Sequence, residues 1–156
     1  MDKGERNMKK HFKAIAIFGI ILAVLCLAIE TRGEAMKNIE LPKPKTIGML
    51  SVEEAIQKRR SVRSYARMNI SIKQLSQLLW SCQGITDPKS GFRAVPSAGA
   101  LYPLEIYVAK SDGVFHYIPD GHRLEVLSDK DVRLALSDAA YGQDYVGVAA
   151  LDIIIC

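Results

Sequence analysis

Apolar residues recur at helical spacing in the segment that begins at Ser71. They fall three or four residues apart and therefore line one helix face: Leu75, Leu78, Leu79 and Cys82. Ser71 and Gln74 have the spacing of a capping box at a helix N-terminus, and Gly84 follows as a C-terminal cap. The pattern predicts a helix between Ser71 and Gly84.

A shorter helix is predicted to begin at Ser51, where Glu54 completes a second capping box. Its apolar face consists of Val52, Ala55 and Ile56. The helix is expected to end in the basic cluster of residues 58–60. Trp80 in the longer helix lies off the apolar stripe, and we expect it to pack against a second subunit or a linker rather than a cofactor.

Alternating apolar and polar positions in the second half of the chain predict three strands joined by tight turns. These strands are expected at residues 104–110, 114–118 and 123–127. Ser128 is predicted to begin a helix, with Asp131 at the box position, that runs to about Ala139. Loops are expected at 85–95 and 141–145, and a buried strand begins at 151–155.

The first 35 residues are typical of an export signal. A basic region precedes the uncharged run 14–29, and Gly33-Glu34-Ala35 has small residues where signal peptidase needs them. The run is long for a signal core and short for a membrane span. A cleaved signal peptide, an uncleaved N-terminal membrane anchor and a buried helix therefore stay open; the first two imply a periplasmic, extracellular or membrane-anchored protein. Residues 36–47 read as an extended polar linker.

The net charge of +4 in 156 residues argues against one class of partner. The charge is nearly balanced after residue 35, and no basic stripe with interleaved aromatic residues appears, which excludes nucleic-acid binding. Three cysteines do not make a disulfide framework, and the three histidines lack metal-ligand spacing. No metal site is predicted.

Two short stretches carry candidate chemistry. Residues 96–105 read Pro-Ser-Ala-Gly-Ala-Leu-Tyr-Pro-Leu-Glu, a small-residue run that lets a ligand lie against the backbone. Residues 59–65 read Arg-Arg-Ser-Val-Arg-Ser-Tyr and place three guanidinium groups, whose forked donors suit a phosphate, at a predicted helix end. Taken alone, the first stretch also suits a plain turn before a strand, and the second a solvated helix end whose arginines complement the helix dipole.

In this order and separation the two stretches resemble those of the FMN-binding nitroreductase family, and the form PSAGALYPLE is similar to its SagB-type dehydrogenase branch. The resemblance covers roughly Gly48 to Cys156. It implies an α+β fold in which a mixed or antiparallel sheet is flanked by helices. It also implies that residues 48–156 are the N-terminal part of an FMN-binding domain that is incomplete at the C-terminus.

The resemblance further implies which residues bind FMN. The phosphate and ribityl end would bind to Arg59, Arg60 and Ser61, and Arg63 would lie near the pyrimidine side of the ring. One ring face would lie against Pro96, Ser97, Ala98 and Gly99. Tyr102 is weighed as a lining residue of the substrate pocket against a simple aromatic at the sheet edge. No residue is assigned a catalytic role.

The implied activity is hydride transfer through FMN in a ping-pong reaction. Nitro or quinone reduction and azoline-type dehydrogenation of a peptide are both open as the reaction, with NAD(P)H as a donor and a small molecule or peptide as substrate. The family also implies a homodimer for the full-length protein. The alternative is an exported, non-catalytic remnant or ligand-binding module that lacks the second half of the active site.

Overall fold

The computed structural model of the chain describes residues 37–156. The predicted export signal or membrane anchor of residues 1–35 lies outside these residues and stays a prediction. Within residues 37–156 no helix combines the length and the apolar character needed to cross a membrane.

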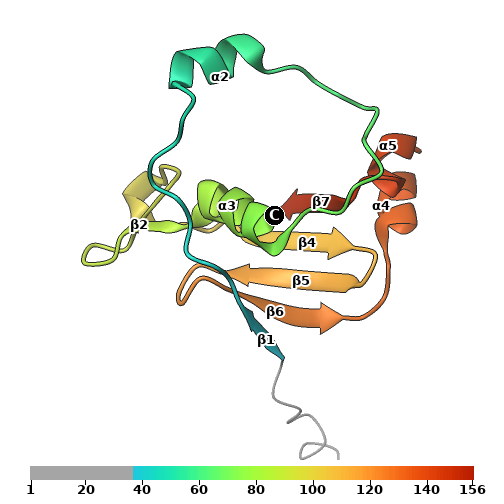
Figure 1. Cartoon of the computed structure of the whole chain (residues 1–156). Coiled ribbons are helices and arrows are strands. Elements are labelled where there is room, and N and C mark those ends of the chain that lie inside the picture. Colours follow the sequence, from blue (N-terminus) through green and yellow to red (C-terminus); the bar gives the residue numbers. More distant parts are fainter. Residues whose placement is uncertain (1–36) are drawn as a thin grey trace, which may run out of the picture. The chain divides into compact units, whose positions relative to one another are not determined.

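A five-stranded sheet, antiparallel throughout, is the largest element of the described part (Figure 1). Its strands lie in the order β1-β6-β5-β4-β7. Their bounds are β1 Asn38–Glu40, β4 Ile106–Lys110, β5 Gly113–Ile118, β6 Arg123–Ser128 and β7 Leu151–Ile155. The predicted hairpins are confirmed, since β4 pairs with β5 and β5 with β6, while β7 pairs with the other edge of β4.

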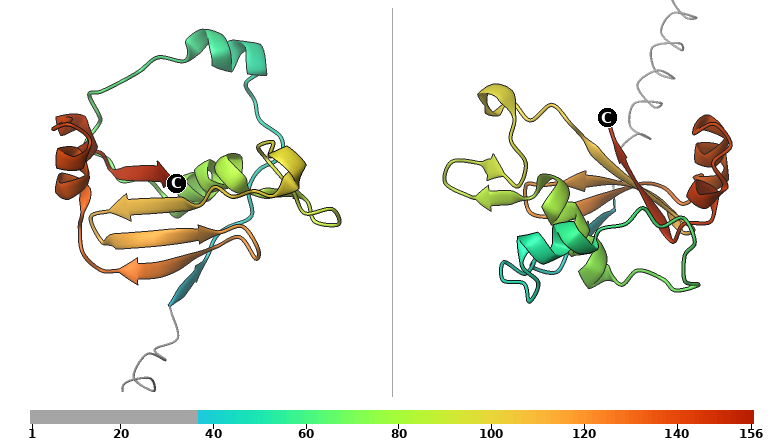
Figure 2. Two further views of the ribbon diagram at one scale, coloured as in Figure 1. Left: turned by 180° about the vertical axis from the view of Figure 1, so that it is seen from behind. Right: turned by 90° about the horizontal axis from the view of Figure 1, so that it is seen from above.

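Four helices of residues 37–156 accompany the sheet, and α3 packs on one of its faces (Figures 1 and 2). Their bounds are α2 Val52–Lys58, α3 Ile72–Gln83, α4 Arg133–Ala139 and α5 Asp144–Gly147. A small hairpin of β2 (Ile85–Asp87) and β3 (Phe92–Arg93) and a 3₁₀ turn, η1 (Ala98–Ala100), connect α3 to β4. Helices beside an antiparallel sheet make the α+β fold that the sequence predicts.

The hydrophobic core lies between α3 and the inward-facing positions of the strands. Because successive strand residues point to opposite faces, every second residue of β4 and β5 contributes. The buried residues of this cluster are Leu41, Leu75, Leu79, Ile106, Val108, Phe115, Tyr117 and Leu124. Cys82 packs against the cluster and is half-buried, whereas Leu78 of the predicted stripe is 43% exposed.

The predicted helix starts at Ser51 and Ser71 are confirmed in detail. The Ser51 hydroxyl accepts from the Glu54 N–H, and the Glu54 carboxylate accepts from the Ser51 N–H. Ser71 and Gln74 make the same reciprocal pair at the start of α3. Each pair satisfies two backbone donors that a helix start leaves without partners. Gly84 ends α3, where a Cβ would lie 2.2 Å from the Trp80 ring.

Two segments expected to be irregular contain strands. Residues 38–40 of the predicted linker are extended, as expected, but they pair with β6 as strand β1. The predicted loop 85–95 contains the hairpin of β2 and β3. All three strands are too short for an alternation pattern to show, and they form because a neighbouring strand satisfies their backbone groups.

The predicted helix from Ser128 begins five residues later. Ser128 stays in β6 because it pairs with Val114. Asp131 does not act as a box partner, since both its carboxylate oxygens bind the Arg133 side chain. The predicted loop 141–145 also differs, because its last two residues begin the short helix α5.

A polar network joins α3 to the turn before β6. The His122 ring nitrogens lie 2.8 Å from the Ser76 and Tyr117 hydroxyl oxygens. The Ser76 hydroxyl donates to the Pro42 carbonyl, so the His122 Nε2–H donates to Ser76 and Nδ1 accepts from Tyr117. Burial raises the pKa of Tyr117 to about 12, which keeps its hydroxyl protonated as a donor. The network fixes the segment after β1 to α3.

We expect acidification to weaken this fold through His122. Burial lowers the pKa of His122 from its usual 6.5, although the nearby Pro42 backbone and the charge of Glu40 oppose the shift. Below that value the unfolded chain binds a proton that folded His122 does not, so the free energy of unfolding falls as pH falls. Urea unfolding at about pH 7.5 and about pH 5.5 should show a smaller difference in His122→Gln than in wild type. An equal difference in both proteins would contradict this assignment.

Candidate functional site

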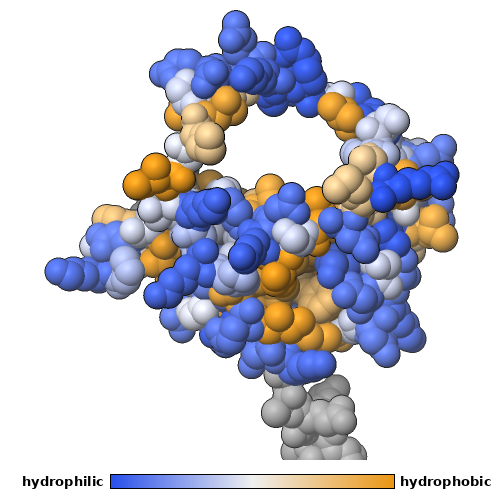
Figure 3. Space-filling view, viewed as in Figure 1, coloured by the Kyte–Doolittle hydropathy of each residue, from blue (hydrophilic) through white to orange (hydrophobic). Residues whose placement is uncertain are grey.

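The arginine cluster predicted to bind a phosphate follows the end of α2. Arg59 is the C-cap residue of α2, and Arg59, Arg60, Ser61 and Arg63 are all exposed. Within residues 37–156 no carboxylate pairs with these three guanidinium groups; the Arg59 Nη1 instead donates to the Ser61 hydroxyl at 3.4 Å. The segment therefore presents positive charge that no side chain described here neutralises, next to the mainly hydrophilic surface of α2 (Figure 3).

Arg60 also does part of what a helix-capping residue does. Its Nη1 donates to the carbonyls of Gln57 and Arg59, both at 2.8 Å, at the helix end where carbonyls lack partners. Arg63 differs, because its guanidinium lies 5.3 Å from the centre of the Tyr145 ring and, among residues 37–156, makes no hydrogen bond to a helix carbonyl. The cluster thus offers more cationic groups than the end of α2 uses.

The second candidate stretch forms a tight loop around η1. Gly99, Ala100 and Tyr102 have positive φ angles of 62°, 54° and 45°. A Cβ at Gly99 would meet nothing closer than 3.8 Å, so its left-handed backbone, rather than a lack of space, favours glycine there. The small residues Ala98 and Gly99 are exposed. The small, exposed residues Ala98 and Gly99 let a flat ligand approach the loop backbone.

The two stretches are not joined to each other. Among residues 37–156 no hydrogen bond, ion pair or cation–π contact connects 59–63 with 96–99. They belong to different connections, one between α2 and α3 and the other between β3 and β4 (Figure 1). A ligand that uses both would bridge them.

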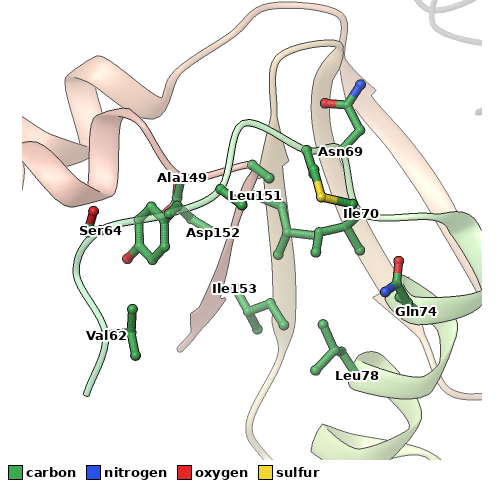
Figure 4. A pocket seen from close by; sticks show the side chains of 14 residues that line it. Val62, Ser64, Asn69, Ile70, Gln74, Leu78, Ala149, Leu151, Asp152 and Ile153 are labelled. Atoms are coloured by element: carbon green, nitrogen blue, oxygen red, sulfur yellow. The ribbon is translucent and has the colours of Figure 1, made fainter. Parts of the chain in front are cut away.

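A cavity of about 560 Å³ is lined in part by Val62 and Ser64, the residues on either side of Arg63 (Figure 4). It is lined by the segment after the arginines, the first turns of α3 and the start of β7. Among residues 37–156, the buried Oδ2 of Asp152 in its lining has no hydrogen-bond partner, and burial raises the pKa of this carboxyl. Sequence reasoning missed this cavity because its walls are about 80 residues apart in the chain and no local pattern relates them.

Two other predictions concern the packing of Trp80 and the binding of metal ions. Trp80 donates through Nε1 to the Ile85 carbonyl at 3.3 Å, and with Pro44 of the predicted linker it lines a cavity of about 330 Å³. Trp80 and Pro44 thus line the same cavity, and the packing of Trp80 against the linker or a second subunit stays a prediction. In the described range 37–156, no group of three or more His, Cys, Asp or Glu residues is arranged to hold a metal ion.

Sequence reasoning also missed Arg93. Its guanidinium carbon lies 4.8 Å from the centre of the Tyr102 ring, and its backbone N–H donates to the Tyr102 hydroxyl at 3.2 Å. No motif marks this residue, since it lies in a two-residue strand within a predicted loop. Tyr102, weighed as a pocket-lining residue, instead contacts Arg93 at the base of its own loop.

Comparison with known proteins identifies relatives for most of the described part. The sequence model of the nitroreductase family matches residues 56–155, which is more than half of the chain. A protein of Methanocaldococcus jannaschii, described as a candidate nitroreductase, is 40% identical over 129 residues, which cover 79% of this chain and 63% of that protein.

One solved structure agrees with that match. A crystal structure of a candidate nitroreductase from Ralstonia eutropha JMP134 superposes with a TM-score of 0.68 at 31% identity, over 79% of this chain and 57% of that one. A crystal structure of a candidate nitroreductase from Anabaena variabilis has a TM-score of 0.48 at 26% identity, over 75% of this chain and 26% of that one. This similarity is too low to support the assignment. The chain spans less than two thirds of the length of the Methanocaldococcus and Ralstonia relatives.

Proposed function

This chain belongs to the nitroreductase family, and on that premise we propose that it is an FMN-dependent oxidoreductase. The observation that carries the proposal is the arginine cluster at the end of α2. Arg59, Arg60 and Arg63 are exposed, and no carboxylate among residues 37–156 pairs with them. A cluster of forked donors without a protein counter-charge fits a phosphate dianion.

The residues present fit FMN at both of its ends. Arg59, Arg60 and Ser61 would bind the phosphate and ribityl end, and Arg63 would supply positive charge near the ring. The left-handed backbone at Gly99 and Ala100 and the small side chains of residues 96–99 would let one ring face approach the loop. Bound FMN would supply hydride transfer in two half-reactions, as a ping-pong cycle requires.

The similarity of PSAGALYPLE to the SagB-type branch supports dehydrogenation of a peptide or small molecule as the reaction, with nitro or quinone reduction as the competing activity. The loop that carries this sequence precedes β4 directly, so a rigid strand anchors it. Since acid–base residues are not identified among residues 37–156, the chain's proposed role is to hold and orient FMN.

Flavin titration followed by reduction tests the proposal. We expect the chain to quench the fluorescence of added FMN, and the bound flavin to lose its visible absorbance when NAD(P)H is added without oxygen. A nitro compound or quinone should then restore the absorbance, and initial rates at several donor concentrations should give parallel double-reciprocal lines. No FMN binding would refute the proposal. Binding without reduction by any donor would support a ligand-binding module that lacks turnover.

A further inference from the structure

Tyr102 differs from its neighbours in the loop around η1. Leu101 beside it is 81% exposed, and Ala98 to Ala100 are exposed, but Tyr102 is partly buried. Its backbone lies in the left-handed region at φ 45°, which is unfavourable for a residue with a large side chain. A conformation of this kind persists only where surrounding contacts hold it.

Three contacts connect Tyr102 to the end of α3. Its hydroxyl accepts from the Arg93 N–H at 3.2 Å, and the Arg93 guanidinium lies over its ring at 4.8 Å from the centre. The Arg93 Nη1 in turn donates to Gln83 Oε1 at 3.4 Å. Gln83 is 3% exposed and is the last residue of α3. The contacts run from a buried helix end to an exposed loop.

The Tyr102 backbone closes the loop from the other side. Its N–H donates to the Ser97 hydroxyl at 2.9 Å, and the Ser97 carbonyl accepts from the Ala100 N–H at 3.0 Å. Ser97 and Tyr102 therefore bracket the residues that carry the left-handed angles at Gly99 and Ala100. If the Tyr102 side chain were lost, these two bonds and the 3.4 Å bond from the Leu101 N–H to the Ala98 carbonyl would have to hold the strained backbone.

We propose that Arg93 and Tyr102 form a latch that positions residues 96–101 for the ring end of the flavin. This inference rests on the proposed function, in which that loop receives the ring. Tyr102 acts through the loop backbone, so it is a positioning residue and touches no reacting atom. The latch affects the ring end only, because the phosphate end is bound by arginines on a separate connection.

Hydrogen exchange of the flavin-free chain tests the latch directly. Tyr102→Leu should speed exchange of the Ala100 amide roughly tenfold, which corresponds to about 1.4 kcal/mol, since one hydrogen bond and one cation–π contact are lost. Tyr102→Phe, which keeps the ring and loses the hydroxyl, should have an intermediate effect. Tyr141→Leu is the matched control, because Tyr141 also has a positive φ, 62°, and is 97% exposed. Unchanged exchange in Tyr102→Leu would overturn the proposal.

Titration with FMN and with riboflavin, which lacks the phosphate, tests the role of the latch in binding. Tyr102→Leu should raise the dissociation constants for both flavins by the same factor, roughly tenfold. Arg60→Ala should weaken the binding of FMN and leave the binding of riboflavin unchanged, a contrast that a general loss of folding would not produce. Faster exchange with unchanged affinity for both flavins would overturn the proposal. If the wild type bound neither flavin, the proposed function would fail, and the exchange result would still decide whether the latch exists.

Discussion

Replacing Arg60 with alanine is expected to raise the dissociation constant for FMN by about 10- to 150-fold. A hydrogen bond to a charged group contributes about 1.5–3 kcal/mol, and about 1.4 kcal/mol is a factor of ten in affinity. Arg60 is exposed, and the contacts it has use only its Nη1, so the rest of its fork is available to a phosphate. Fluorescence titration with FMN at fixed ionic strength measures the change, because charge pairs of this kind weaken with added salt.

Two variants separate phosphate binding from other roles of Arg60. Arg67→Ala is the control, since Arg67 is exposed and lies outside the cluster, and its affinity for FMN should stay within about twofold of wild type. Arg60→Lys keeps the charge without the fork and should recover part of the loss. Equal FMN affinity in wild type and Arg60→Ala would mean that the cluster is a solvated helix end. That interpretation also explains the hydrogen bonds of Arg60 to the carbonyls of Gln57 and Arg59.

The elements that were predicted correctly depend on neighbours in the sequence. The capping boxes of Ser51 and Ser71 require only a partner three residues on, and the hairpins of β4, β5 and β6 require only alternation and short turns. The α+β fold was predicted from the resemblance of two short stretches to the family. The structure agrees, since α3 and the strands of the sheet form from the segments that flank these two stretches.

The elements that were missed depend on partners distant in the chain. Strand β1 exists because residues 38–40 meet β6 more than 80 positions later, and three residues cannot show a period. The start of α4 was misplaced because Ser128 satisfies its backbone in the sheet rather than in a helix. No sequence pattern indicated a role for Arg93, because its role depends on the contact between its guanidinium and the Tyr102 ring.

The candidate site follows the same division. The residue types at 59–63 and 96–99 predicted a ligand site from the sequence alone. The contact of Arg63 with Tyr145 and the hydrogen bonds of the loop could not be predicted in this way. The structure adds that the two stretches are held very differently. The loop is braced by Arg93, Tyr102 and Ser97, while α2 has no buried residue and the arginines after it are exposed. Ordering of the arginine segment is therefore expected to accompany phosphate binding, and this ordering would reduce the net affinity.

Leu79→Ala is expected to lower the free energy of unfolding by about 2–5 kcal/mol, the range for emptying a buried leucine site. Leu79 is 0% exposed in the core beneath the sheet, while its neighbour Leu78 is 43% exposed although sequence periodicity put both on one apolar face. Leu78→Ala is the matched control and should cost less than about 1 kcal/mol.

Urea unfolding followed by circular dichroism measures both variants, with equal slopes against urea as the check that each unfolds in the same two-state manner. A loss of this size is a large share of the about 5–15 kcal/mol typical of a domain, so Leu79→Ala could fail to fold. Leu79→Met, which conserves volume, then gives the comparison and should cost less than about 1.5 kcal/mol. Equal losses in Leu78→Ala and Leu79→Ala would contradict the burial difference. They would mean that the cavity wall containing Leu78 is covered in solution.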